Sequence, residues 1–215
     1  MPDNAGACNK KVAGVILAAG CGSRMGTIKQ LLPFENTTIL GRVIATAKAS
    51  KLDEIILVLG FEAGRIRRSL DLTHPDMTGI HVIENPGWEK GQSFSVAAGL
   101  AALPPDTGGA LFLLGDQPMV MVPTINRLVS AFQITDHWIL VPRFQGKRGN
   151  PVLVAKPLFS HLASPAGDAG ARVLFRKFAH RMQGIAVSDA GILKDVDTPE
   201  DYRKLEAARD DFSTS

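Results

Sequence analysis

This chain of 215 residues contains only two cysteines, and aromatic residues make up just 6% of it. The two cysteines, Cys8 and Cys21, cannot build the disulfide framework that stabilises many small secreted proteins. No histidine is close to Cys21 in the sequence, which argues against a catalytic thiol at this position. We therefore expect a protein of a reducing compartment, the cytoplasm.

Two further catalytic signatures are missing. The five histidines are scattered, and no pair of them has the spacing of a zinc site on a helix. The chain also has no Gly-x-Ser-x-Gly segment, the usual setting of a serine nucleophile in hydrolases. The residues therefore do not suggest hydrolysis by a nucleophile and its base.

Strong charge imbalance and long apolar runs are absent as well. The chain has 24 Lys and Arg against 21 Asp and Glu, a net charge of +3. Its basic residues form no stripe interleaved with aromatic residues, so we expect no nucleic-acid partner. No apolar run reaches the ~20 residues of a membrane span, so we expect no membrane partner either.

The most informative segment is an apolar run followed by a glycine-rich loop. Residues 12–19 have the length of a buried strand, and three glycines follow within residues 20–26. Arg24 lies inside this loop, and Lys29 follows it. Backbone N–H groups of such a loop, together with two cations, can cradle a polyphosphate, although a plain turn after a strand also uses glycine. The spacing fits neither a Walker A loop nor a dinucleotide-binding fingerprint.

The rest of the chain alternates between strand-like and helix-like segments, which predicts an α/β fold. We expect a single Rossmann-like, doubly wound, mostly parallel sheet with helices on both faces. Residues 1–11 are expected to be disordered, and residues 12–210 to form one domain. Its nucleotide-binding half would span about residues 12–120 and its acceptor half about 121–210. Strands are expected at 12–19, 55–59, 80–83, 110–114, 138–141 and 152–154, and helices at 39–49, 63–70, 96–103, 123–132, 172–178 and 199–209.

The fourth predicted strand ends in Gly115-Asp116-Gln117-Pro118. An acidic residue at the carboxyl end of a central strand lies where open α/β sheets bind their ligands. The alternative is a helix N-cap, but the next predicted helix begins several residues later. Carboxylate oxygens are preferred ligands of Mg²⁺, so Asp116 is a candidate metal ligand.

Two other segments leave alternatives open. Gly91-Gln92-Ser93-Phe94-Ser95 precedes a helical pattern, so its serines could cap that helix or face a ligand. Asp195 and Asp197 precede the last predicted helix, and their spacing points both side chains the same way along an extended chain.

Residues 17–32 read Leu-Ala-Ala-Gly-x-x-Ser-Arg-Met-Gly-x-x-Lys-x-Leu-Leu. This segment resembles the signature of the MobA-like nucleotidyltransferases, and within them it is most similar to the molybdenum cofactor cytidylyltransferases. The Gly-Asp-x-Pro and Asp-x-Asp-Thr-Pro-Glu-Asp segments extend the resemblance from Val15 to about Leu205. The family transfers a nucleoside monophosphate from a nucleoside triphosphate to a phosphorylated acceptor and releases pyrophosphate. The resemblance thus implies a sheet of the nucleotidyltransferase type.

The resemblance also implies roles for individual residues. Arg24, Lys29 and Asp116 would be catalytic. Asp116 and Asp197 would hold Mg²⁺, with Asp195 as the alternative to Asp197. The implied nucleotide-binding residues are Leu17, Ala18, Ala19, Gly20, Gly22, Ser23, Arg24, Lys29, Gly91, Ser93 and Ser95. The implied acceptor-binding residues are Arg148, Gly149, Asn150, Asp168 and Arg172; members of the family often carry histidine in place of Asn150.

The implied reaction is transfer of CMP from CTP to the phosphate of the molybdenum-pterin cofactor. In relatives, Ala-Ala-Gly in the first loop accompanies CTP and Ala-Gly-Gly accompanies GTP, so a guanylyltransferase is an alternative. A sugar or polyol phosphate as acceptor is another. A third reading is a non-catalytic partner that delivers the pterin to a molybdenum hydroxylase apoenzyme. The presence of Asp116 and Lys29 disfavours this third reading, since binding alone does not need a metal-holding aspartate.

Overall fold

The computed structural model describes residues 10–22, 25–70, 77–163 and 175–212, with side chains as far as residue 207. Residues 1–9 of the segment predicted to be disordered lie outside these ranges. Lys10 belongs to the same segment, yet its backbone N–H donates a hydrogen bond to Gln133 Oε1 at 2.9 Å. The described chain is thus held from Lys10 onward.

An eight-stranded sheet forms the centre of the molecule, in the order β10-β7-β9-β6-β1-β4-β5 with β8 paired to β7. β1 runs parallel to β4 and β6, and β4 runs parallel to β5. The mostly parallel α/β fold predicted from the sequence is confirmed. The strands are β1 (Val12–Ala18), β4 (Glu54–Leu59), β5 (Ile80–Glu84), β6 (Gly109–Leu114), β7 (Ile139–Phe144), β8 (Lys147–Arg148), β9 (Val152–Ala155) and β10 (Met182–Ala186).

One antiparallel strand determines which loops share an edge of the sheet. β9 pairs antiparallel with both β6 and β7, so β6 and β7 run in the same direction. The carboxyl ends of β1, β4, β6 and β7 therefore lie at one edge. The glycine-rich loop, the segment after β6 and the turn between β7 and β8 all follow strands at this edge.

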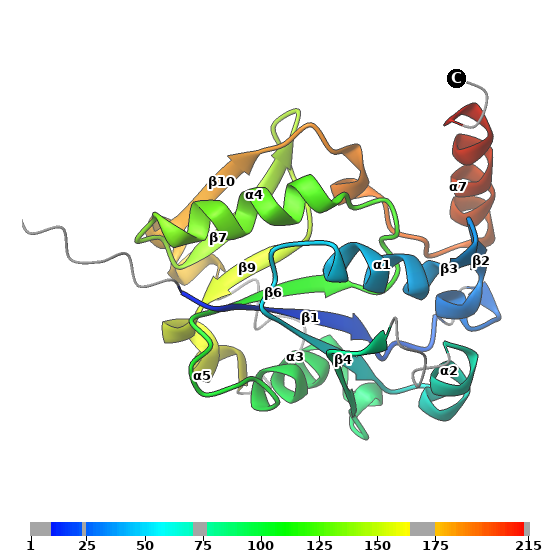
Figure 1. The fold of residues 1–215 in the computed structure, drawn as a ribbon, viewed down its shortest axis with the longest axis horizontal. Coiled ribbons are helices and arrows are strands. Elements are labelled where there is room, and N and C mark those ends of the chain that lie inside the picture. Colours follow the sequence, from blue (N-terminus) through cyan, green and yellow to red (C-terminus); the bar gives the residue numbers. More distant parts are fainter. Residues whose placement is uncertain (1–9, 23–24, 71–76, 164–174, 213–215) are drawn as a thin grey trace, which may run out of the picture.

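Helices cover both faces of the sheet, as predicted (Figure 1). α1 and α4 pack on one face, and α3 and α5 pack on the other. α7 lies beside a small hairpin at one end of the molecule (Figure 1). The helices are α1 (Ile39–Lys48), α2 (Ala63–Ser69), α3 (Gln92–Ala101), α4 (Val122–Gln133), α5 (Phe159–Ala163) and α7 (Pro199–Phe212). Short 3-10 turns are η2 (Lys29–Leu31), η4 (Trp88–Lys90), η5 (Lys156–Leu158), η6 (Ala179–Arg181) and η7 (Ala190–Leu193).

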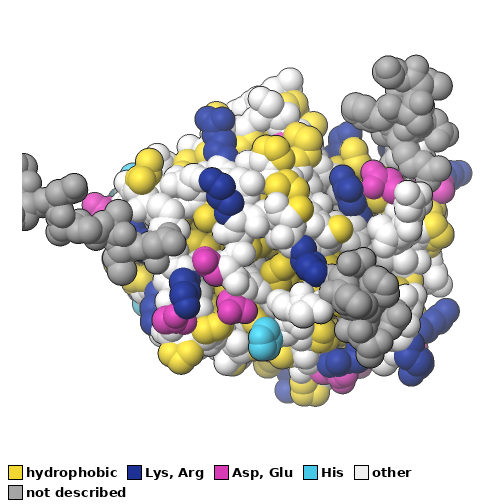
Figure 2. Space-filling model, viewed as in Figure 1, with side chains coloured by type: hydrophobic (Ala, Val, Ile, Leu, Met, Phe, Trp, Pro, Cys, Tyr) yellow, Lys and Arg dark blue, Asp and Glu magenta, His cyan; other side chains and the backbone are white. Residues whose placement is uncertain are grey.

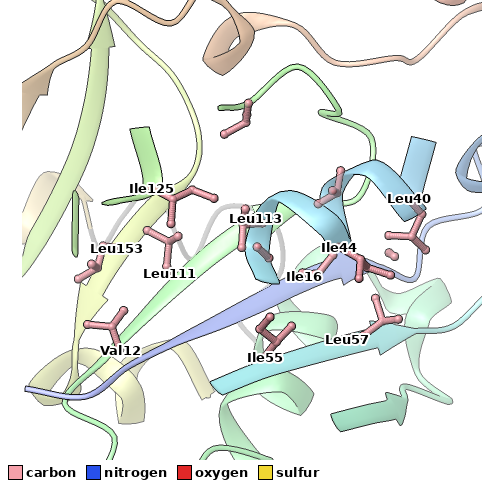
Figure 3. Close-up of a cluster of buried hydrophobic side chains, with 14 of the residues drawn as sticks. Val12, Ile16, Leu40, Ile44, Ile55, Leu57, Leu111, Leu113, Ile125 and Leu153 are labelled. Atoms are coloured by element: carbon pink, nitrogen blue, oxygen red, sulfur yellow. The ribbon is translucent and has the colours of Figure 1, made fainter. Parts of the chain in front are cut away.

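Alternation along the strands builds a hydrophobic core on each face. In β4, Ile55 and Leu57 join the core under α1 and α4, whereas Ile56 joins the core under α3 and α5. Figure 3 shows Leu40 and Ile44 of α1 reaching down to the strands of the first core. Because both faces are covered, β4 is continuously apolar from Ile55 to Leu59, after Glu54 at its start, and this pattern made the strand predictable.

A two-stranded hairpin formed by β2 (Pro33–Phe34) and β3 (Thr37–Thr38) was not predicted. It contributes Phe34 to a third core, which also contains Val196 and Leu205. The hairpin therefore anchors α7 and the segment leading into it. α7 begins as predicted, because Asp201 Oδ2 accepts a hydrogen bond from the Thr198 backbone N–H at 2.9 Å and stabilises the first turn.

No helix in the described ranges has the length and apolar character that crossing a bilayer requires. Lys and Arg side chains are spread over the face shown in Figure 2 and form no continuous stripe there.

Two isoleucines in and after α4 differ in burial, so substituting each of them tests how much the core contributes to stability. Ile125 is 0% exposed and Ile134, just after the helix, is 89% exposed. We expect Ile125→Ala to lower the free energy of unfolding by about 2–5 kcal/mol, because it leaves a cavity. Ile134→Ala is the matched control and should change it by less than about 0.5 kcal/mol. Urea unfolding measures both, and equal effects would contradict the assigned burial.

Candidate active site

A cleft of about 320 Å³ opens at the carboxyl edge of the sheet. It lies where the strand order reverses, since β1 has β4 on one side and β6 on the other. Open α/β sheets bind their ligands at such points. The predicted nucleotide-binding residues that line the cleft are Leu17, Ala18, Ala19, Gly20, Gly22, Lys29, Gly91 and Ser95.

Four predicted site residues, Ser23, Arg24, Asp168 and Arg172, lie outside the described ranges. Among the described residues, Ser93 does not line the cleft.

α3 begins at Gln92, earlier than predicted, so Ser93 and Ser95 lie inside its first turns and do not cap it; its N-cap residue is Gly91. The Ser95 hydroxyl is buried and accepts a hydrogen bond from Asn85 Nδ2 at 3.1 Å. The Ser93 hydroxyl oxygen is also buried, and within the described part of the chain it has no hydrogen-bond partner. Of the two, Ser93 therefore has the side chain with unused hydrogen-bonding capacity.

Gln30 holds the start of the glycine-rich loop in place, and sequence reasoning missed it. Its side-chain Nε2 donates to the carbonyl oxygens of Ala18 at 3.2 Å and Gly20 at 2.9 Å. Gln30 is only 3% exposed, so these bonds form in a protected setting. Gly22 then takes a φ of 56°, in the left-handed region that favours glycine.

One ammonium joins the two predicted metal ligands. Lys29 Nζ lies 2.5 Å from Asp116 Oδ2 and 2.8 Å from Asp197 Oδ1. The Lys29 side chain is only 10% exposed, so solvent screens these contacts weakly. Residues predicted from three distant segments thus meet at one point, where Lys29 and Asp116 line the cleft.

Burial and charge shift the pKa values of this group. Burial acts most strongly on Lys29 and lowers its pKa, but the attraction of Asp116 and Asp197 together outweighs it, and the pKa is raised above 10.5. For Asp116, burial is again the largest effect and raises the pKa above 3.8. Lys29 opposes this rise, while repulsion from Asp195 and Asp197 adds to it. Lys29 is shared between Asp116 and Asp197, so its positive charge offsets only part of the effect of burial on the pKa of Asp116.

A second glutamine gives Asp195 surroundings that differ from those of Asp197. Gln117 is 2% exposed, and its Nε2 donates to Asp195 Oδ1 at 3.0 Å. The Val196 backbone N–H donates to the Asp116 carbonyl oxygen at 3.0 Å, which fixes the segment alongside. Asp195 is thereby held by Gln117, and Asp197 is the one that contacts Lys29.

The carboxylates fit a divalent ion that takes further ligands from a substrate. Asp116 Oδ1 is buried without a hydrogen-bond partner in the described part of the chain, so this carboxylate has unused acceptor capacity. The described ranges contain no group of three or more His, Cys, Asp or Glu side chains placed to hold a metal ion. Mg²⁺ is commonly held by one or two carboxylates plus substrate phosphates, which suits Asp116 and Asp197.

The described acceptor residues lie at the same sheet edge but line neither this cleft nor the second cavity described below. Arg148 lies in β8, and its guanidinium is 5.1 Å from the ring centre of Phe175. A side chain at Gly149 would collide with the Ile192 carbonyl oxygen, and the Asn150 N–H donates to that oxygen at 3.0 Å. The turn carrying Arg148 is therefore packed closely against η7.

A second cavity, of about 510 Å³, lies between the segment before α7 and α7 itself. Asp197 lines it, whereas Lys29 lines the first cleft. The contact between Asp197 and Lys29 therefore separates two hollows at this edge of the molecule.

The raised pKa of Asp116 predicts a pH dependence of stability. Between pH 3.8 and the raised pKa, the folded protein holds a proton on Asp116 that the unfolded chain has released. The free energy of unfolding of the wild type, relative to Asp116→Asn, should therefore fall as pH rises through this range. Urea unfolding at a series of pH values measures the difference.

Asp106→Asn is the control of opposite sign. A hydrogen bond from Lys11 lowers the pKa of the exposed Asp106 carboxyl below 3.8. Its stabilising contribution is therefore lost as pH falls from 3.8 through the lowered pKa. A difference between wild type and Asp116→Asn that grows with rising pH would contradict the assignment for Asp116.

Comparison with known proteins identifies the family. The MobA-like NTP transferase domain matches residues 14–183. "Purine catabolism protein PucB" of Bacillus subtilis is 31% identical, over 91% of this chain and 96% of its own. "Nicotine blue oxidoreductase" of Paenarthrobacter nicotinovorans is 32% identical, over 90% and 96%. "Molybdenum cofactor cytidylyltransferase" of Escherichia coli is 28% identical, over 87% and 92%.

Solved structures agree with this assignment. Rv0371c of Mycobacterium tuberculosis superposes with a TM-score of 0.80 at 34% identity, covering 92% of this chain and 98% of that one. The same protein in complex with manganese gives a TM-score of 0.74 at 33% identity, covering 91% and 97%. The chain therefore belongs to the family of MobA-like nucleotidyltransferases.

Proposed function

We propose that this protein transfers CMP from CTP to the phosphate of the molybdenum-pterin cofactor and releases pyrophosphate. The main support is the meeting of the glycine-rich loop, Lys29 and Asp116 at one cleft, with Asp197 paired to Lys29 beside it. The choice of CTP and of this acceptor draws on the relative named molybdenum cofactor cytidylyltransferase. Ala18-Ala19-Gly20 supports CTP over GTP in the same way, by resemblance.

The reaction exchanges one bond to phosphorus for another. An oxygen of the acceptor phosphate attacks the α-phosphorus of CTP, and the bond from that phosphorus to the bridging oxygen of pyrophosphate breaks. The acceptor phosphate is ionised near neutral pH, so it needs no general base. The protein must align the two phosphates and offset the charge that gathers on the leaving pyrophosphate.

The nucleotide half supplies groups for both tasks. Backbone N–H groups of residues 20–22, with Lys29 and Arg24, would bind the triphosphate and stabilise the leaving group. Mg²⁺ bound by Asp116 and Asp197 would supply a Lewis acid that neutralises charge on the phosphate oxygens. Gly91, Ser93 and Ser95 would face the base and ribose, and the positions of Gly91 and Ser95 in the lining of the cleft support this placement for those two.

The acceptor would enter from the other half of the molecule. Arg148, Gly149 and Asn150, with Asp168 and Arg172, would hold it. We place the reaction in the cytoplasm, with a molybdenum hydroxylase apoenzyme as the recipient of the product.

A substrate panel tests the proposal. The protein is given Mg²⁺ and each nucleoside triphosphate in turn, with molybdenum-loaded pterin, with sugar or polyol phosphates, or with no acceptor, and pyrophosphate is measured. Release that requires both CTP and the pterin supports the proposal. Pyrophosphate release with GTP would show that GTP is the nucleotide substrate. Release with a sugar phosphate would show that this compound is the acceptor. Tight pterin binding without release would support the delivery role instead.

Asp116→Asn should lower kcat by about 10²–10³-fold or more, the usual effect of losing a group that stabilises transition-state charge. Its circular dichroism should match that of the wild type. Asp106→Asn is the control, since that carboxylate is exposed and paired with Lys11 instead. Full activity in Asp116→Asn would remove this residue from the mechanism.

Arg148→Ala should raise the KM for the acceptor about tenfold or more, the loss expected when one charge-assisted hydrogen bond to a phosphate is removed. The KM for CTP should change little. Arg65→Ala, on the exposed side of α2, removes the same charge elsewhere and should leave both constants unchanged. An equal rise in both constants for Arg148→Ala would show that its effect is not specific to the acceptor.

A further inference from the structure

We propose that Lys29 competes with the divalent ion for Asp116 and Asp197, so that tight metal binding requires a nucleotide to draw the lysine away. The inference rests on the metal site of the proposed function. It goes beyond that function by giving Lys29 a second role, which makes the binding of metal and nucleotide cooperative.

Lys29 binds one oxygen of each carboxylate that would hold the metal. Asp116 Oδ2 and Asp197 Oδ1 both lie within 2.8 Å of its ammonium. A divalent ion held by the same two carboxylates, even with the help of Asp116 Oδ1, which has no hydrogen-bond partner among the described residues, would lie close to this ammonium. The two cations therefore compete, because like charges a few ångströms apart repel strongly in a poorly screened site.

The neighbouring carboxylate offers no easy substitute. Asp195 is engaged by the buried Gln117 side chain. No group of three or more potential side-chain ligands is present within the described ranges. Two carboxylates leave most of the coordination sphere of Mg²⁺ or Mn²⁺ open, and substrate phosphates commonly fill part of it. Without a nucleotide, the ion would have to displace Lys29 for only two protein ligands.

A bound triphosphate changes both sides of this competition. The Lys29 stem runs beside the glycine-rich loop, since a Cβ on Gly22 would lie 3.3 Å from Lys29 Cδ. Lys29 also lines the cleft together with Gly20 and Gly22. Rotation about the terminal bonds of its flexible side chain would bring the ammonium to phosphates held by that loop. The triphosphate then replaces the carboxylates as partner of Lys29 and adds its own oxygens to the ion. Each ligand therefore strengthens binding of the other.

The test measures Mn²⁺ binding to the nucleotide-free protein, from the electron paramagnetic resonance signal of free Mn²⁺. Lys29→Met should bind Mn²⁺ about tenfold or more tightly than the wild type, because removing a competing charge-assisted hydrogen bond is worth at least that factor. Adding Asp116→Asn to Lys29→Met should abolish the gain, which would locate the ion at Asp116. Equal or weaker binding by Lys29→Met would overturn the proposal.

Two further variants serve as controls for this measurement. Lys11→Met removes one positive charge just before β1, at the opposite edge of the sheet, where Lys11 pairs with Asp106. It should leave Mn²⁺ binding unchanged. If Lys11→Met gained as much Mn²⁺ affinity as Lys29→Met, the change in net charge alone would explain the effect, and the proposal would be overturned. Lys29→Gln keeps a neutral donor for the two carboxylates, and it should also bind Mn²⁺ more tightly than the wild type. This second variant provides the test if Lys29→Met does not fold.

A non-hydrolysable CTP analogue separates this inference from the proposed function. The analogue should raise the Mn²⁺ affinity of the wild type by a larger factor than that of Lys29→Met. A wild type that binds no Mn²⁺ even with the analogue would refute the metal site itself. Binding with the analogue, but no gain in either Lys29 variant, would leave the metal site intact and refute only the competition.

Discussion

A single positive charge, shared between two acidic side chains, joins the three segments of the candidate active site. Lys29 comes from η2, Asp116 from the end of β6 and Asp197 from the approach to α7. None of these segments would point its charged group into a half-buried cleft without the other two, because an unpaired buried charge is costly. The site is therefore a property of the assembled fold and not of any one loop. The strand order makes this possible by ending β1 and β6 side by side.

The sequence was most informative where burial is complete. β1, β4 and β6 were predicted to within about a residue because strands covered on both faces are continuously apolar. β10 was missed: it is a short strand that pairs with β7 alone, and its residues Met-Gln-Gly-Ile-Ala show neither a continuous apolar run nor clear alternation. The two-residue strands of the small hairpin are too short to carry any periodicity.

The same division applies to the site. Lys29 and Asp116 could be predicted because charged residues stand out at the end of a strand and inside a family signature. Gln30 and Gln117 could not, since glutamine has no catalytic signature and their value lies in contacts set by the tertiary fold. Gln117 does lie within the Gly-Asp-x-Pro segment, the one local signal that could have drawn attention to it. Spacing alone treats Asp195 and Asp197 alike; only their contacts in the fold distinguish them, Asp195 with Gln117 and Asp197 with Lys29.

Relatives of similar identity carry names as different as a cytidylyltransferase and an oxidoreductase, so the scaffold alone does not fix the chemistry. The position of β9 limits how such diversity can arise. β9 belongs to the later half of the chain, yet it fills the space between β6 and β7 and completes the hydrogen bonding of β6. A fragment ending near residue 120 would leave the edge of β6 bare and prone to pair with other chains. New specificities in this architecture are therefore more readily gained by remodelling turns at the rim than by exchanging whole halves between genes.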